Sequence, residues 1–570
     1  MKDDWKTPFE RGNGNQTTTW EECIAFHQKL AERFPQVLSF ECAGRADSGL
    51  PIHVGVISAD GDFDPDRIKA SGRTVVFNNN GIHPGEPEGI DVCMALVRDL
   101  CTEPERLRRL SDTVLVYIPL YNVDGALNRQ NTSRVNQLGP ESFGFRGNAR
   151  HLDLNRDFIK ARSRNARVFS RLFAAWDPDV FIDTHTSNGA DYSHVLTLIP
   201  TQPDKLGGRL GAYLRETMLP QLYLDMAERG WPMCPYVNPV DEIPDTGIAD
   251  FLDTPRFSTG YAALHHCIGF MPETHMLKPF ADRYHGMRAF MDSVLDYAAS
   301  HGRQIHVDRV HDRASVSSAA QWPLVWTLDE ERPTTFRFSG YRAIYEPSRI
   351  GRYDRLRYDR SAAYEKDIPY FDRYRVAKAV APPLAYLVPQ AWEEVIERLR
   401  LNGVLMREIG SAHTLALETY RIKHFEKSSN PFEGHHLSTL VDLAPEGAYI
   451  PVQPGDWIVP LHQLRDRYVI ETLEPEAMDS FFRWGFFDSV LDKKETFSAY
   501  VFEDEAECLL NLEPELRNAF ETWKFEHPEL LTDANAVLQF IFARCRKYAE
   551  PEYRRYPVYR ITDPSVLSKT

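Results

Sequence analysis

The sequence predicts an α/β protein: a doubly wound, mixed and mostly parallel sheet, followed by a separate mixed α+β C-terminal region. Up to about residue 300, short runs of β-branched and aromatic residues alternate with stretches of helical spacing, which is typical of βαβ units. Past His301, Arg- and Tyr-rich runs with β-like alternation follow. A chain of 570 residues is also too long for one core. We expect a first domain at 1–301, a small β-rich module at 302–385 and an α+β region at 386–570.

The predicted elements follow in chain order. A helix is expected from the Thr17-Thr18-Thr19 run to about Phe34, with Glu21 or Glu22 placed for a capping box. Strands are expected at 37–42, 52–57, 74–77, 113–119, 179–183 and 268–272, and helices from Pro87, at 160–175 and at 280–299. The remainder reads as β structure at 404–475 and helices at 391–402, 513–525 and 533–548.

Composition excludes several classes of protein. A formal net charge of −16 argues against a nucleic-acid partner, because phosphate binding needs clustered Lys and Arg. The eight cysteines are scattered without a Cys-x-x-Cys pair, which indicates free thiols. No run approaches the ~18 apolar residues of a membrane span. The N-terminus lacks the apolar segment of a signal peptide, so the sequence as given predicts a cytoplasmic protein. A secreted or periplasmic protein is expected instead if a signal segment has been removed.

The stretch 73–88 organises the functional hypothesis. Thr74 to Phe77 reads as a buried strand that runs into the turn residues 78–81, and a helix is expected to start at Pro87. His83 and Glu86 then lie on the loop at the strand's carboxyl end, where open α/β sheets place their chemistry. An imidazole and a carboxylate three residues apart can reach one metal ion, although such pairs are also common on solvated loops.

Two further polar residues end predicted strands. His185 follows the strand at 179–183, and Glu273 ends the apolar run at 268–272. On neighbouring strands, His185 would supply a third ligand and leave one position for water, as a hydrolytic zinc site requires. Glu273 would suit a general base beside the metal. Taken singly, a core histidine and a solvated strand-end carboxylate are the simpler interpretations.

Five motifs follow one another along the chain: His83-Pro-Gly-Glu86, Asn122-Val-Asp-Gly125, Arg146 to Phe158 (Arg-Gly-Asn-Ala-Arg-His-Leu-Asp-Leu-Asn-Arg-Asp-Phe), His185 and Glu273. Together, and in this order, they resemble the carboxypeptidase A-like family of zinc metallocarboxypeptidases over about residues 18–300. The resemblance implies the carboxypeptidase fold, a single zinc ion held by His83, Glu86 and His185, and Glu273 as general base.

The resemblance also implies roles for residues around the metal. Asp153 resembles the carboxylate that orients His83. Asn155 and Arg156 resemble the clamp for the C-terminal carboxylate of a peptide substrate. Arg146 resembles the residue that stabilises the oxyanion, and Arg134 competes with it because the loop between them cannot be aligned from one sequence. Tyr261 is the candidate for a tyrosine over the substrate, with a buried aromatic residue as the alternative.

The resulting hypothesis is a zinc carboxypeptidase that hydrolyses the C-terminal peptide bond of peptides with a free carboxylate. One rival is an amidase of the desuccinylase or aspartoacylase type; there the first histidine is typically followed by Gly-Asn-Glu, whereas Pro-Gly-Glu follows His83. A second is a non-catalytic binding protein on the same fold. A third alternative places the main function in residues 302–570. The one candidate pair of metal ligands in that part of the sequence is His435-His436.

Overall fold

The computed structural model describes residues 5–567. Its contacts divide the chain into two compact units. The first holds the chain up to Pro382 with Glu393–Leu405 and Pro460–Ser480, and the second holds Pro383–Trp392, Met406–Val459 and the chain from Phe481 onward. The domain boundaries predicted at residues 301 and 385 stay predictions, because units defined by contacts need not be units that fold alone.

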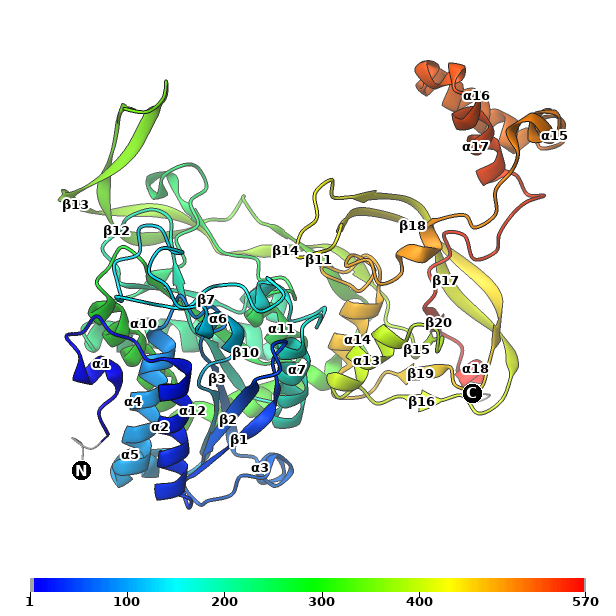
Figure 1. Ribbon diagram of the computed structural model, residues 1–570. Helices are drawn as coiled ribbons and strands as arrows, with labels where there is room; N and C mark the ends of the chain where they lie inside the picture. The colour runs from blue at the N-terminus through cyan, green and yellow to red at the C-terminus, as the bar shows by residue number, and fades with distance from the viewer. Residues whose placement is uncertain (1–4, 568–570) are drawn as a thin grey trace. The chain divides into compact units, whose positions relative to one another are not determined.

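The first unit is built on one mixed sheet with the strand order β1-β2-β4-β3-β5-β10-β7-β8, and β6 continues beside β10 (Figure 1). The central strands β4, β3, β5 and β10 are parallel, and β8 is parallel to β7. The antiparallel pairs are β1 with β2, β2 with β4, and β7 with β10. The predicted mixed, mostly parallel sheet is therefore confirmed. Its strands are β1 Leu38–Arg45, β2 Pro51–Ile57, β3 Thr74–Asn79, β4 Thr113–Ile118, β5 Val180–Asp183, β6 His185–Ser187, β7 Leu196–Pro200, β8 Cys234–Pro235 and β10 Ile268–His275.

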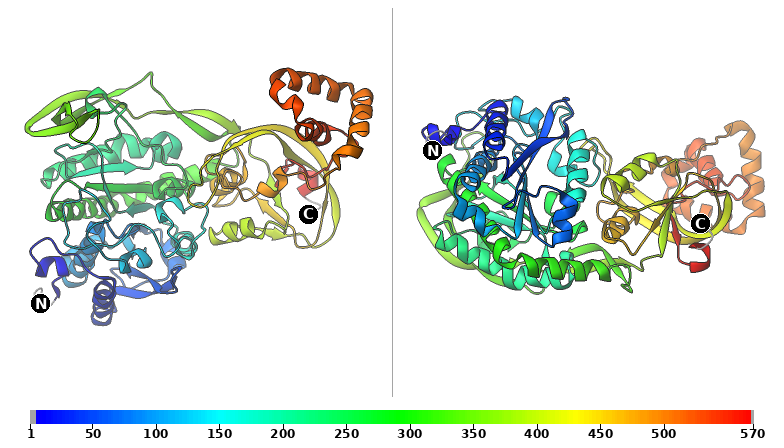
Figure 2. Two further views of the ribbon diagram at one scale, coloured as in Figure 1. Left: turned by 45° about the horizontal axis from the view of Figure 1, so that its top comes forward. Right: turned by 90° about the horizontal axis from the view of Figure 1, so that it is seen from below.

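Helices cover both faces of this sheet, as Figure 2 shows. Along β3, Val76 joins the large core formed with α2, α4, α10 and α12. The next residue, Phe77, points to the other face and contacts Phe169 and Phe173 of α7. Strands buried on both faces explain why they read as continuous apolar runs in the sequence. The helices are α2 Trp20–Arg33, α4 Glu88–Thr102, α7 Arg164–Trp176, α10 Leu219–Glu228, α11 Ser258–Leu264 and α12 Phe280–Ser315.

Two helix starts match the sequence signals. Thr19 caps α2, and its hydroxyl and the Glu22 carboxylate form the expected capping box. Pro87 directly precedes the first residue of α4. This second start matters for function, because it fixes where the loop after β3 ends.

Helix α12 is longer than predicted and runs through residue 301 to Ser315. A Cβ on Gly302 would lie 1.9 Å from Thr74 Oγ1, so the helix packs closely on the start of β3. Near its C-terminal end, Arg309 and Arg313 both pair with Asp177. The expectation of β structure directly after residue 301 was wrong for the residues up to Ser315. The inward face of this part of the helix carries charged residues that are buried in ion pairs, so the sequence lacks the apolar spacing that indicates a packed helix.

The first unit also contains elements that lie far along the chain. The long hairpin of β12 and β13 forms a three-stranded sheet with the short strand β9. A separate two-stranded sheet pairs β11 with β14. These elements are β9 Ile248–Ala249, β11 Trp322–Leu328, β12 Thr334–Pro347, β13 Asp354–Phe371, β14 Tyr374–Val380, α13 Glu393–Leu401 and α14 Asp466–Leu473.

The second unit combines a six-stranded sheet with a helical cluster, which matches the predicted α+β character. The helix α15 was not predicted, and α14 interrupts the stretch expected to be β. No helix in residues 5–567 is both long and apolar enough to cross a lipid bilayer. The strands are β15 Ala385–Val388, β16 Arg407–Glu408, β17 His413–Lys427, β18 Ser438–Val452, β19 Trp457–Pro460 and β20 Tyr559–Ile561; the helices are α15 Ala499–Leu512, α16 Pro514–Glu526 and α17 Ala534–Arg544.

Candidate metal centre and active site

Three predicted metal ligands converge at the carboxyl edge of the sheet. His83 and Glu86 lie on the loop between β3 and α4, where the Glu86 backbone N–H donates to the carbonyl of His83 over 2.8 Å. His185 begins β6, close to this loop. One ligand atom from each residue lies within 4.8 Å of the other two, and all three side chains are buried. The centres of the two imidazole rings are 5.0 Å apart, a separation that lets them share one ion.

Both histidines are oriented in the same way. Nδ1 of His83 lies 3.2 Å from Glu86 Oε1 and has no hydrogen-bond partner, and Nδ1 of His185 lies 3.2 Å from Glu86 Oε2. The Nε2 atoms point outward onto carboxylates: His83 onto Asp153 at 2.8 Å, and His185 onto Asp183 at 3.0 Å. Metal-binding histidines usually donate their second ring N–H to such a partner.

This donor set fits zinc. Two imidazole nitrogens and one carboxylate oxygen are the protein ligands of many catalytic zinc sites, which keep a further position open. Burial would raise the pKa of Glu86, but Arg134 and His83 hold it well below its usual range. Burial would lower the pKa of His185, whereas the Asp183 carboxylate raises it to about 10. The buried Nδ1 of His83, which makes no hydrogen bond, is itself a group that a bound cation would satisfy.

A cavity of about 490 Å³ opens beside these ligands. Glu273 lines it and pairs with His185 in the parallel register of β10 and β6, which brings its carboxylate next to the candidate metal position. Burial raises the pKa of Glu273, and the Glu86 charge adds to this. The lining residues are His83, Glu86, Ser133, Arg134, Val135, Arg146, Asn155, Arg156, His185, Thr186, Ser187, Asn188, Ile199, Tyr236, Phe251, Phe257, Met271, Glu273 and Met276.

The two arginines proposed for the oxyanion both reach Glu86 Oε1, Arg134 at 2.6 Å and Arg146 at 3.2 Å. Every nitrogen of the Arg134 guanidinium is engaged, because it also donates to Gln137 and to the carbonyl of Thr186. Its side chain is only 13% exposed, against 43% for Arg146. The geometry therefore favours Arg146 as the arginine that can turn toward a substrate.

Asn155 and Arg156 enter the same cavity from a short 3₁₀ turn at Leu154–Arg156. Asp153 caps this turn by accepting the Asn155 backbone N–H over 2.9 Å, and it also accepts Arg146 Nε over 2.9 Å. One carboxylate thus links His83, Arg146 and the turn. The guanidinium carbon of Arg156 lies 4.5 Å from the centre of the Phe257 ring.

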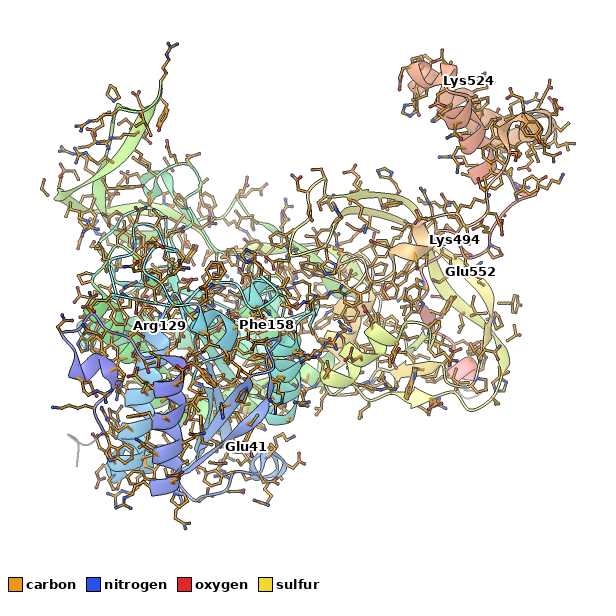
Figure 3. All side chains as sticks on the ribbon, viewed as in Figure 1. Glu41, Arg129, Phe158, Lys494, Lys524 and Glu552 are labelled. Carbon is orange, nitrogen blue, oxygen red and sulfur yellow. The ribbon has the colours of Figure 1, made fainter. Side chains whose placement is uncertain are left out.

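Tyr261 is not in this cavity, so its assignment as a substrate-binding residue was wrong. The side chain has no exposed surface and packs between Phe158, which is labelled in Figure 3, and Phe173. Its hydroxyl donates to Asn402 over 2.5 Å. The alternative, a buried aromatic residue, is what the structure contains. The tyrosine that does line the cavity is Tyr236.

Sequence reasoning missed two further features of the site. Asp183 has no exposed surface and accepts from His185 and, over 2.9 Å, from Asn79. Its position two residues before the histidine at a strand end was an available signal. The second feature is an apolar wall formed by four cavity residues. No sequence signal marked it, because its members come from three segments that lie far apart along the chain: Ile199, Phe251 with Phe257, and Met271.

Comparisons with known proteins agree with this site. Residues 23–180 match the family model described as zinc carboxypeptidase. The matched stretch includes His83 and Glu86, whereas His185 and Glu273 lie beyond it. The predicted resemblance is therefore confirmed over these residues, and the match identifies the chain as a metallopeptidase.

The chain is also similar to curated fungal proteins. Carboxypeptidase 2 of Trichophyton rubrum is 21% identical over 487 residues and covers 83% of this chain and 85% of its own. Carboxypeptidase 2 of Trichophyton equinum is 22% identical over 426 residues, with 72% and 73% covered. A match that covers 83% of 570 residues is longer than residues 1–301, so the similarity to the Trichophyton rubrum protein extends into the C-terminal part of this chain. A solved metallo-carboxypeptidase from Burkholderia cenocepacia is 16% identical over 52% of this chain and 70% of its own, with a TM-score of 0.35.

Proposed function

We propose that this protein is a zinc-dependent carboxypeptidase that hydrolyses the C-terminal peptide bond of peptides with a free carboxylate. The observation that carries the proposal is the convergence of His83, Glu86 and His185 at one end of a cavity that also holds Arg156 and Glu273. The same cavity thus offers a place for a metal ion, a proton acceptor and a cation for a carboxylate.

The substrate would be held at its C-terminal end. The planar guanidinium of Arg156 suits bidentate capture of a carboxylate, and the Asn155 side chain lies beside it. This places the scissile carbonyl between the metal ligands and Arg146, whose guanidinium donates to the oxygen where negative charge develops.

Glu273 carries the proton in this scheme. When bound, zinc supplies a Lewis acid that makes a water molecule acidic enough to attack a carbonyl near neutral pH. The Glu273 carboxylate accepts a proton from the attacking water and returns it to the departing amine nitrogen. The C–N bond breaks, leaving the shortened peptide with a new carboxylate and a free amino acid. The burial of Glu273 among charged groups favours this role, because it raises the pKa of the carboxyl group toward the pH of catalysis.

The test uses the full chain loaded with zinc and three probes: the tripeptide Ala-Ala-Phe, its C-terminal amide, and N-acetylphenylalanine. Release of phenylalanine from the tripeptide, loss of this release with a strong chelator and its return with zinc are expected. The amide should be cleaved far more slowly, because it lacks the carboxylate. Preferred hydrolysis of N-acetylphenylalanine would favour the amidase alternative. Zinc binding without any hydrolysis would favour the non-catalytic one.

A further inference from the structure

The stretch between Tyr236 and Phe257 forms one side of the substrate cavity, although it has little regular structure of its own. It contributes Tyr236, Phe251 and Phe257 to the lining. The rings of Phe251 and Phe257 meet edge to face, 5.0 Å apart at 77°. Apart from a 3₁₀ turn at Pro244–Thr246, the two-residue strand β9 is its only regular element. Such a segment needs contacts from outside to keep its side chains in place.

The hairpin of β12 and β13 provides the first of these contacts. Residues Tyr370 and Phe371 of β13 pair in parallel with β9. The backbone N–H of Asp250 donates to the carbonyl of Phe371 over 2.8 Å, and the Tyr374 hydroxyl donates to the carbonyl of Asp250 over 2.9 Å. The residue before Phe251 is therefore held on both its donor and its acceptor side by a part of the chain beyond residue 301.

Asp479 provides the second contact, next to Phe257. One of its carboxylate oxygens accepts the backbone N–H of Arg256 over 3.0 Å, and the other accepts Nε over 2.9 Å and a terminal amino group over 2.6 Å. The Asp479 side chain is 1% exposed. A single buried carboxylate thus fixes both the backbone and the side chain of Arg256.

The residues that follow Arg256 touch the candidate carboxylate clamp. Phe257 lies under the guanidinium of Arg156, at 4.5 Å from ring centre to carbon. The Ser258 backbone N–H donates to the Asn155 side-chain oxygen over 3.1 Å. A displacement of Arg256 would therefore move Phe257 and Ser258, and with them the contacts that hold Arg156 and Asn155.

We propose that Asp479 is a positioning residue for substrate binding: through Arg256 it holds Phe257 and Ser258 against Arg156 and Asn155, so that the clamp faces the substrate carboxylate. This inference rests on the proposed function. It assigns part of the chain beyond residue 301 a role in substrate recognition, which accords with a curated relative that resembles this chain over that part as well.

The test measures binding without turnover, by calorimetry with Ala-Ala-Phe and its C-terminal amide on zinc-loaded protein carrying Glu273→Gln. In this parent the acid should bind more tightly than the amide. Asp479→Asn keeps an oxygen for the Arg256 backbone but removes the charge that fixes the guanidinium. The preference for the acid should fall about tenfold or more, because small displacements of a binding group have large effects. The zinc content should not change.

Two further variants separate positioning from general stability. Asp99→Asn removes a buried carboxylate that pairs with Arg98 and Arg288 and does not line the cavity, so the preference should persist. Arg256→Ala should reproduce the effect of Asp479→Asn, and the double variant should show little further loss, because both changes break one interaction.

An unchanged preference for the acid in Asp479→Asn would overturn the positioning role while leaving the proposed function intact. An equal loss in Asp99→Asn would also overturn it, since the effect would then report stability. A parent protein that binds acid and amide equally would contradict the proposed clamp itself.

Discussion

Replacing Asp183 by asparagine is expected to weaken zinc binding without touching a metal ligand. The two carboxylate oxygens of Asp183 serve different donors: one accepts from Nε2 of His185 over 3.0 Å, the other from the side-chain amide of Asn79 over 2.9 Å. An asparagine has nearly the same volume but offers only one oxygen. Its NH₂ group would face one of the two donors, so one of them loses its acceptor.

The size of the effect follows from this lost contact. A hydrogen bond to a charged group contributes about 1.5–3 kcal/mol, which corresponds to a factor of about 10 to 150 in an equilibrium constant. Loss of a carboxylate that orients a metal-bound histidine typically weakens the metal affinity about 10- to 100-fold, which agrees with this range. We expect the zinc dissociation constant of Asp183→Asn to rise by this factor, as measured by competition with a chromophoric chelator at fixed pH.

Asp91→Asn is the matched control. Asp91 is also fully buried in the first unit, but it contacts Thr17 and Thr18 and no candidate metal ligand. Its zinc affinity should equal that of the unchanged protein. A zinc affinity of Asp183→Asn within twofold of the unchanged protein would refute the argument that this carboxylate orients His185.

Three further predictions concern catalysis, specificity and stability. Glu273→Gln should lower kcat about 10²- to 10⁴-fold with unchanged zinc content by metal analysis, and a loss of less than tenfold would exclude Glu273 as general base. Met271 faces Ile199 across the β10–β7 ladder, and both line the cavity together with Phe251. An apolar C-terminal side chain should therefore be preferred, so that kcat/KM for Ala-Ala-Phe exceeds that for Ala-Ala-Lys by at least about tenfold. Equal values would contradict an apolar subsite. Burial raises the pKa of Asp91 to about 7, so the protonated carboxyl contributes its full stability below about pH 4 and loses it as the pH rises through 7. In urea unfolding, the free energy of unfolding of Asp91→Asn should therefore gain up to about 4 kcal/mol over that of the unchanged protein between pH 4 and 8. A difference that does not depend on pH would contradict the raised pKa.

The catalytic core was predictable because its signals are local. β-branched and aromatic runs mark the buried strands, and a histidine or glutamate at the end of such a run lands at one edge of a parallel sheet. His83, Glu86, His185 and Glu273 all follow this rule, and the structure brings all four to one cavity.

Other parts of the site were not predictable, because tertiary contacts decide them. Tyr261 and Tyr236 are both tyrosines on segments before β10, and only packing against Phe173 buries the first while the second lines the cavity. The link from Asp479 to Arg256 spans 223 residues and leaves no local pattern. Nor does a sequence reveal that Asp177 accepts two arginines from α12, which makes the end of that helix read as exposed.

The length of α12 limits how far this enzyme can be shortened. A chain ending at residue 301 would stop in mid-helix, before the glycine that lets the helix approach Thr74. It would also lack Arg309, Arg313 and Arg465, which all pair with Asp177. A buried negative charge would then remain just before the strand that leads to His185. The peptidase is therefore expected to require its later residues as part of its own scaffold, so that trimming just after the last of the site motifs yields an insoluble product and not a minimal enzyme.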